Sequence, residues 1–116
     1  MTANQKTVES YMDGFRATDC PRILSCLTDD VEWLIPGFFH VQGKDEFAAH
    51  IVDDGFEGTP EISVTRMVEE NDVVVAEGSV RAGRTDGSVM NLVFCDVFEM
   101  RGAKIRKLTS YLMEIK

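Results

Sequence analysis

The spacing of hydrophobic and polar positions changes once along the chain. Up to about residue 51, apolar side chains recur three and four positions apart, as on the buried face of an amphipathic helix. From about residue 61 onward they alternate with polar side chains, as in strands with one buried face. Helices followed by consecutive strands predict an α+β fold, and the 116 residues fit a single domain, 1–116.

Three helices are expected in the first half of the chain. The first covers 2–17 and starts at a capping box. The second starts at residue 19 or 20, has a proline in its first turn, where a missing N–H costs nothing, and ends over 28–30. The third covers 43–55 and lies between two glycines, of which the second is placed to stop it.

Four long strands joined by tight turns are expected in the second half. They cover 61–69, 73–82, 89–100 and 104–115. A shorter strand at 31–35 is followed by a turn-rich loop, and 55–60 is expected to be a loop as well. We expect a strongly curved, mostly antiparallel sheet with the three helices packed on its concave face. Such a cone has a pocket at its wide end and leaves its other face free to pair with a second subunit.

The strand at 89–100 carries a carboxylate on an otherwise apolar face. Its two-residue period places Asp96 beside Met90, Leu92, Phe94, Phe98 and Met100. Burying a charged carboxylate is costly unless the group is paired, hydrogen-bonded or neutralised. Asp96 is therefore the main candidate for a general acid or base, or for a hydrogen-bond donor to a developing oxyanion. The structural alternative is a bond to a backbone N–H, or exposure where the strand twists outward.

Composition and charge argue against several classes of protein. The formal net charge of −8 disfavours binding to nucleic acid or to anionic membranes. No signal-peptide pattern or membrane-spanning apolar run is present in the sequence. Three cysteines without a CxxC pair fit a reducing compartment, so we expect a cytoplasmic protein. No spacing of metal ligands and no glycine-rich phosphate loop is found, so no metal and no cofactor is expected.

Short motifs stand in a defined order along the chain. They are TDDVEWLIPG at 28–37, Gly-Lys at 43–44, and Val-Phe-Glu at 97–99 followed by a turn and Lys-Ile at 104–105. With the order of helices and strands, they make the chain resemble the NTF2-like superfamily, and within it the SnoaL-like and ketosteroid-isomerase-like proteins. The resemblance covers nearly the whole chain. It implies a cone-shaped fold, usually dimeric, whose hydrophobic pocket serves different purposes in different members.

Ketosteroid isomerases combine an aspartate base with an oxyanion hole made by a tyrosine and a protonated aspartic acid. The resemblance puts Tyr11 at the tyrosine, Asp96 at the aspartic acid and Ile35 at the base. The oxyanion hole is therefore expected without the usual base, which argues against steroid isomerisation by that mechanism. His40 is the candidate replacement, because the pKa of histidine lies near working pH. The alternative is that His40 is an exposed loop residue without a role.

Limonene-epoxide hydrolases, on the same fold, need an arginine between two aspartates. The tripeptide Arg84-Thr85-Asp86 looks similar, but it lies in a predicted hairpin loop. The position of the second aspartate is occupied by Ser110, which could instead add a polar group to the pocket. We therefore reject this reading.

Large apolar side chains are expected to bind the ligand, because small-molecule pockets are mostly apolar with a few placed polar groups. The candidates are Phe15, Trp33, Phe38, Phe56, Phe94, Tyr111 and Met113. The expected function is binding of an apolar small molecule, with isomerase, cyclase or dehydratase chemistry through an enol-like intermediate. The alternatives are a binding module without turnover and an interaction domain. The expected protein partner is a second copy of the chain, paired through the sheet.

Overall fold

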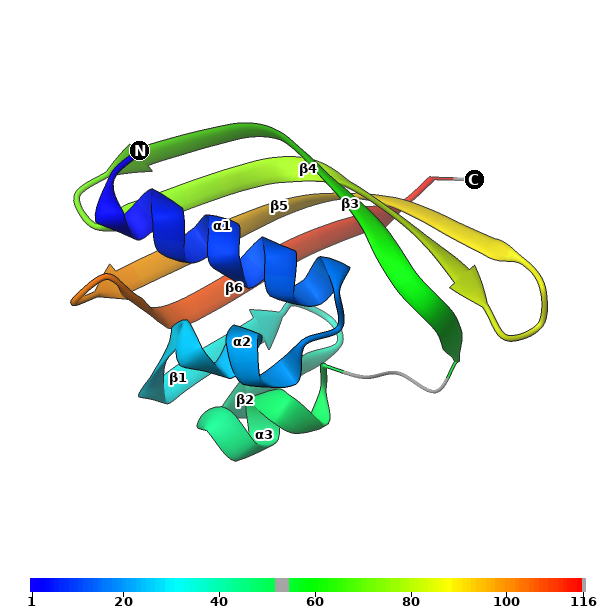
Figure 1. Ribbon diagram of the computed structural model, residues 1–116, viewed down its shortest axis with the longest axis horizontal. Coiled ribbons are helices and arrows are strands. Elements are labelled where there is room, and N and C mark those ends of the chain that lie inside the picture. Colours follow the sequence, from blue (N-terminus) through cyan, green and yellow to red (C-terminus); the bar gives the residue numbers. More distant parts are fainter. Residues whose placement is uncertain (52–54, 116) are drawn as a thin grey trace.

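The computed structural model of the protein describes residues 1–51 and 55–115. Along this part of the chain, helices come first and strands dominate afterwards (Figure 1). The elements are α1 (Ala3–Arg16), α2 (Cys20–Ser25), β1 (Leu27–Ile35), β2 (Phe39–Gln42), α3 (Lys44–Ala49), β3 (Phe56–Glu70), β4 (Val73–Arg84), β5 (Val89–Arg101) and β6 (Lys104–Glu114).

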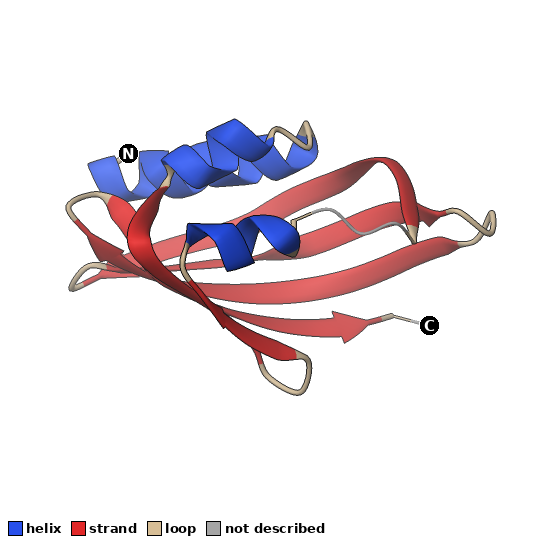
Figure 2. Ribbon diagram, turned by 90° about the horizontal axis from the view of Figure 1, so that it is seen from below, coloured by secondary structure: helices blue, strands red, loops and turns tan. Residues whose placement is uncertain are grey.

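The six strands form one sheet in the order β2-β1-β6-β5-β4-β3. All neighbouring strands are antiparallel except β1 and β6, which are parallel. The sheet curls around the helices (Figure 2). Helix α1 packs across β3, β4 and β6, and α3 packs on β1 and β2, while α2 lies against both helices. The predicted α+β class, with helices on the concave face of a curved sheet, is confirmed.

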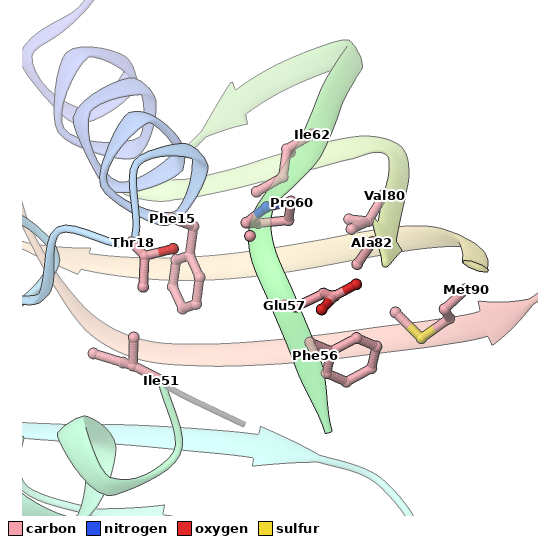
Figure 3. A pocket seen from close by; sticks show the side chains of 11 residues that line it. Phe15, Thr18, Ile51, Phe56, Glu57, Pro60, Ile62, Val80, Ala82 and Met90 are labelled. Atoms are coloured by element: carbon pink, nitrogen blue, oxygen red, sulfur yellow. The ribbon is translucent and has the colours of Figure 1, made fainter. Parts of the chain in front are cut away.

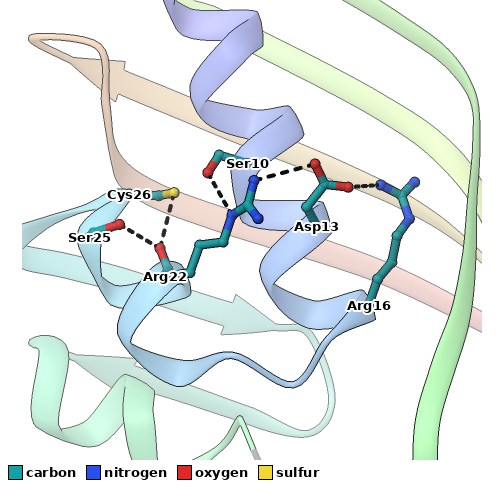
Figure 4. A network of polar contacts seen from close by, with 6 residues as sticks. All are labelled: Ser10, Asp13, Arg16, Arg22, Ser25 and Cys26. Carbon is teal, nitrogen blue, oxygen red and sulfur yellow. Dashed lines mark hydrogen bonds and ion pairs between the residues drawn. The ribbon is translucent and has the colours of Figure 1, made fainter.

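The ends of α1 and α2 follow from local sequence. Thr2 and Gln5 form the expected capping box at the start of α1. The carboxylate of Asp19 accepts the backbone N–H of Arg22 and caps α2. The two helices are also joined on their outer side, where Asp13 pairs with Arg16 and Arg22 (Figure 4). None of the described helices is long and apolar enough to cross a membrane.

Helix α2 is shorter than predicted, and β1 is longer. The helix ends at Ser25, where the N–H of Cys26 bonds back to the carbonyl of Ile23. The carbonyl of Cys26 then accepts the N–H of Ile105, which starts the pairing of β1 with β6. The expected end of the helix at 28–30 was wrong because this long-range pairing draws those residues into the sheet.

Two predicted loops are strands. The loop after β1 is a tight turn closed by the N–H of Phe38 and the carbonyl of Ile35, and it leads into β2. The loop expected at 55–60 is the first part of β3, which pairs with the end of β4. Helix α3 ends at Ala49, before the expected glycine, and residues 52–54 lie outside the described part of the chain.

The core lies between α1, α3 and the concave face of the sheet. Phe47, Phe98, Ile105 and Leu108 are fully buried there. Gly78 in β4 lets the paired strand β3 approach closely, because a Cβ atom at this position would lie 2.0 Å from the carbonyl oxygen of Ser63. The phenyl ring of Phe94 covers the same glycine. This close approach lies beside the register shift between Val64 and Arg66 in the pairing of β3 with β4.

Candidate functional site

A cavity of about 160 Å³, here called the inner chamber, lies between α1 and the concave face of the sheet. Its walls come from α1, from β1 and from the central strands, and they are almost entirely apolar. The lining residues are Tyr11, Met12, Phe15, Trp33, Ile35, Ile62, Val80, Leu92, Phe94, Asp96, Ser110 and Leu112.

Asp96 is the ionisable residue of the inner chamber that titrates near neutral pH. It lies on β5 opposite Ser110 of β6, and only 8% of its surface is exposed. Burial raises its pKa to about 7, against a smaller opposing effect from the Ser110 hydroxyl, which hydrogen-bonds the carboxylate. The Oδ1 atom is buried and has no hydrogen-bond partner among the described residues. A buried carboxylate oxygen of this kind is available to a ligand.

Tyr11 contributes a hydroxyl group to the same chamber from α1. Its ring packs at tilted or edge-on angles against Phe15, Phe47 and Phe98. Burial raises the pKa of Tyr11 well above its ordinary value, and the nearby charge of Asp96 raises it further. No hydrogen bond joins the hydroxyl to another described residue. The hydroxyl of Tyr11 is therefore protonated, lies near Asp96 and is available to donate a hydrogen bond to a ligand.

Trp33 and Ser110 link the wall of the chamber to Asp96. The indole Nε1–H of Trp33 donates to Oγ of Ser110 over 3.1 Å, and both residues are buried. Because this bond occupies an acceptor position of the hydroxyl, the hydroxyl hydrogen is free to point at Asp96. Ser110 is thus oriented by Trp33 and stabilises the charged form of Asp96.

A second cavity of about 300 Å³, here called the outer chamber, lies toward the open end of the sheet (Figure 3). Phe15, Ile62 and Val80 line both chambers. The other lining residues are Thr18, Ile51, Phe56, Glu57, Gly58, Pro60, Ala82 and Met90. Among the described lining residues, Glu57 is the only ionisable one, and Figure 3 shows its carboxylate between apolar side chains.

The structure brings together most of the residues predicted for the pocket. Tyr11, Phe15, Trp33, Phe94 and Asp96 all line the inner chamber. The outer chamber adds Phe56, on β3. Ile35, which the resemblance puts at the position of the ketosteroid isomerase base, also lines this chamber. The expected constellation of a tyrosine and an aspartic acid without the usual base therefore matches the geometry of the chamber.

His40 and Phe38 were placed wrongly at the pocket. Strand β2 alternates, so Val41 faces the core while His40 lies on the outer face, opposite Leu34 of β1. The ring of His40 is half exposed, and its Nε2 lies 3.2 Å from Oε2 of Glu32. Phe38 sits in the turn after β1 and is 78% exposed. Neither residue lines a chamber, so His40 has no geometric support as a base.

Tyr111 and Met113 were also placed wrongly, because the side-chain parity of β6 was misjudged. Asp96 pairs with Ser110, so Ser110 shares the concave face and its neighbour Tyr111 points to the convex face. Tyr111 is 53% exposed and Met113 is 70% exposed. Both lie in a shallow depression on the convex face, beside Val93 and Cys95.

Sequence reasoning missed several lining residues. Val80 and Ala82 alternate with polar neighbours on β4, so the strand period alone could have placed them on the concave face. Glu57 and Ile62 belong to β3, whose first part was predicted to be a loop. No local signal marks Glu57, because its position depends on pairing with Gly83 of β4.

The comparison with protein families gives one match: the model of the SnoaL-like domain covers residues 8–108. The chain belongs to this family. No protein with a curated description matches it.

Solved structures show the same fold. An NTF2-like protein of unknown function from Burkholderia pseudomallei has a TM-score of 0.89 at 21% identity, over 97% of this chain and 92% of that one. An LEH-like epoxide hydrolase from M. tuberculosis has a TM-score of 0.84 at 18% identity, over 96% and 83%. TerC, co-crystallised with polyporic acid, has a TM-score of 0.82 at 26% identity, over 94% and 90%.

The likeness to the epoxide hydrolase does not extend to the arginine and aspartates of that chemistry. Arg84 ends β4 and pairs with Glu114 across the surface, and Asp86 caps the following turn through Ser88. No arginine is among the described residues that line the two chambers. In the described part of the chain, no cluster of three or more His, Cys, Asp or Glu residues is placed to hold a metal ion.

Proposed function

We propose that the protein binds an apolar small molecule that bears a carbonyl or hydroxyl oxygen, and that Asp96 moves a proton to or from that molecule. The observation that carries the proposal is Oδ1 of Asp96, a buried oxygen without a partner among the described residues, in an apolar chamber. Buried polar atoms of folded proteins nearly always have hydrogen-bond partners. A ligand atom is the partner that this oxygen lacks.

Enolisation is the chemistry that this pair of residues suits, and it is a step shared by isomerases, cyclases and dehydratases. The ionised carboxylate of Asp96 accepts a proton from the carbon next to a carbonyl group. The electron pair of the broken C–H bond forms a carbon–carbon double bond, and the carbonyl oxygen becomes an enolate. The hydroxyl of Tyr11 donates a hydrogen bond to that oxygen. Return of the proton to another carbon completes an isomerisation.

The pKa of Asp96 supports this role. A base is most effective when its pKa lies near the working pH, and burial raises the pKa of Asp96 to about 7. We expect the rate to rise with pH up to about 7 and then to level off, because only the ionised carboxylate accepts a proton. Tyr11 remains protonated over the same range, because its pKa is raised well above its ordinary value.

Binding without turnover is the second candidate, and one observation favours it. Ile35, which the resemblance puts at the position of the ketosteroid isomerase base, lines the inner chamber. The described lining of the inner chamber has no residue besides Asp96 that exchanges a proton near neutral pH. In this case Asp96 anchors a ligand and takes no part in a reaction.

Exchange of the α-hydrogens of 2-tetralone in D₂O, followed by proton NMR, separates these candidates. The compound is small, apolar and readily enolised. The proposal predicts catalysed exchange that Asp96→Asn abolishes and that His40→Ala leaves unchanged, because His40 lies outside both chambers. Exchange that survives in Asp96→Asn would rule out Asp96 as the base. Binding of 2-tetralone without exchange would support the second candidate.

The convex face of the sheet is the proposed contact with a second copy of the chain. Val93, Tyr111 and Met113 lie there with exposed fractions of 40, 53 and 70%. Contiguous exposed apolar side chains often mark interaction sites. Such a contact would leave both chambers, on the opposite face, open to a ligand.

The proposed location is the cytoplasm. Cys20, Cys26 and Cys95 are all free thiols in the described structure. Free and partly buried thiols are compatible with a reducing compartment. A blocked-thiol mass measurement on protein isolated from cells would test this, because a disulfide in the native protein would contradict it.

A further inference from the structure

The inner chamber, which has a volume of about 160 Å³, shares part of its lining with the outer chamber. It adjoins the outer chamber of about 300 Å³, and three side chains, those of Phe15, Ile62 and Val80, line both. A ligand held at Asp96 that extends past these side chains therefore enters the outer chamber. The pocket suits a long molecule better than a compact one.

The length of such a molecule can be judged from β5, which runs along both chambers. Asp96 lines the inner chamber and Met90 lines the outer one, on the same face of β5. Six residues of antiparallel strand cover roughly 20 Å. The side chains of Asp96 and Glu57 extend into the pocket and shorten this distance. A ligand that contacts both carboxylates therefore needs roughly 15 Å between its two polar ends.

Glu57 determines which kind of ligand group is favoured in the outer chamber. It pairs with Gly83 of β4, which in turn pairs with Val89 of β5, so it lies level with the outer end of the pocket. No ion pair or hydrogen bond joins the Glu57 side chain to another described residue. No lysine, arginine or histidine is among the described residues lining either chamber. A cationic group is therefore favoured beside Glu57, and an anionic one is disfavoured.

We propose that the ligand is an elongated, mostly apolar molecule with an oxygen at one end and a positively charged amine at the other. The oxygen lies at Asp96 and Tyr11, the apolar body passes between Phe15 and Val80, and the amine lies at Glu57. This rests on the proposed function for the oxygen end. It adds the class of ligand and a second recognition residue, Glu57.

Three matched phenols test the proposal by calorimetric titration. Each carries a para-alkyl chain of about eight carbons, which places the two ends of the molecule roughly 15 Å apart, and the chain ends in ammonium, methyl or carboxylate. We expect the ammonium compound to bind about two- to fivefold more tightly than the methyl compound, and the carboxylate to bind most weakly, as is usual for an exposed charge pair. Added salt should reduce the differences.

Variants separate this inference from the proposed function. Glu57→Gln should remove the preference for ammonium, whereas Glu61→Gln should keep it. Glu61 is the matched control because it lies on the same strand, is exposed and lines neither chamber. Asp96→Leu should weaken all three phenols alike.

The outcomes are distinct. Equal affinities of the three phenols, or a preference that survives in Glu57→Gln, would overturn the amine inference while leaving the oxygen site in place. A preference lost equally in Glu57→Gln and Glu61→Gln would assign it to net charge, and this too would overturn the inference. Affinities that do not respond to Asp96→Leu would overturn both the inference and the proposed function.

Discussion

The two faces of β5 and β6 differ in an unusual way: the concave face buries a carboxylate, and the convex face exposes an aromatic ring. On the concave face, Asp96 is a carboxylate with 8% of its surface exposed. On the convex face, Tyr111 of the paired strand is 53% exposed although it is aromatic. These residues lie close together, because Cys95 pairs with Tyr111 and Asp96 with Ser110. Buried charges and exposed aromatic clusters are the informative exceptions in a fold.

The two faces of β5 and β6 therefore suit two different kinds of contact. The concave side has an apolar chamber in which a polar ligand atom would complete the hydrogen bonding of Asp96. The convex side is an open surface that fits a second protein copy. Substitutions on one face should therefore leave the property of the other face unchanged.

The largest expected effect is that of Asp96 on stability. Its pKa rises from 3.8 in the unfolded chain to about 7 in the fold, so the native protein holds a proton that the unfolded chain has released. The stabilisation is full below pH 4 and is lost as pH rises through 7, a change of roughly 3 to 5 kcal/mol. Asp96→Asn should remove this loss and make the variant the more stable protein at pH 8. Urea denaturation at several pH values measures it, and parallel pH profiles for the two proteins would contradict the prediction.

The next effect concerns the link from Trp33 through Ser110 to Asp96. Ser110→Ala leaves the buried indole N–H without its acceptor, which should cost about 1 to 2 kcal/mol of unfolding free energy. It also removes the hydrogen bond that lowers the pKa of Asp96, so that pKa should rise further. The pH profile of 2-tetralone exchange should shift to higher pH. Ser79→Ala, in the middle of β4, is the control and should leave the profile in place.

Tyr11→Phe should affect binding more than folding. The Tyr11 hydroxyl makes no hydrogen bond to another described residue, so its removal should change the unfolding free energy by less than about 0.5 kcal/mol. A phenol or ketone at Asp96 would lose one donor, and its affinity should fall about five- to tenfold. Calorimetric titration and thermal denaturation measure both quantities. A stability loss without an affinity loss would show a structural tyrosine instead.

The smallest effect on the monomer is expected on the convex face. Tyr111→Glu places a charge at an exposed position, so the unfolding free energy should change by about 0.5 kcal/mol or less. The proposed dimer should dissociate, as light scattering coupled to size-exclusion chromatography would detect. 2-Tetralone exchange per subunit should stay as in the parent protein. A dimer that persists in the variant would move the contact elsewhere.

Much of this fold was predictable because local signals agreed with the tertiary arrangement. The capping box of Thr2 fixed the start of α1, and Asn71-Asp72 marked the turn between β3 and β4. The alternation in β5 placed Asp96 on the buried face. Strand β2 was missed because it is only four residues long and lies between two glycine-containing turns. The first part of β3 was missed because it contains Gly58 and Pro60, turn signals that pairing with β4 overrides.

The inward direction of Tyr11 and Asp96 was predictable from sequence, whereas the positions of His40 and Tyr111 were not. Tyr11 and Asp96 lie on elements whose periodicity is clear, so their inward direction follows from sequence. His40 and Tyr111 failed because a shift of one residue in a strand reverses the face of every side chain. That register is set by a partner strand distant in sequence, as the pairing of Asp96 with Ser110 illustrates.

By itself, the sequence determined the class of fold, the family and the presence of a carboxylate in an apolar layer. These follow from hydrophobic period, turn residues and short motifs, which are local properties. Only the tertiary structure decided that Asp96 lacks a partner for Oδ1, that Trp33 orients Ser110, and that Glu57 faces the outer chamber. Each of these depends on the register between strands and on the curvature of the sheet, which long-range pairing sets.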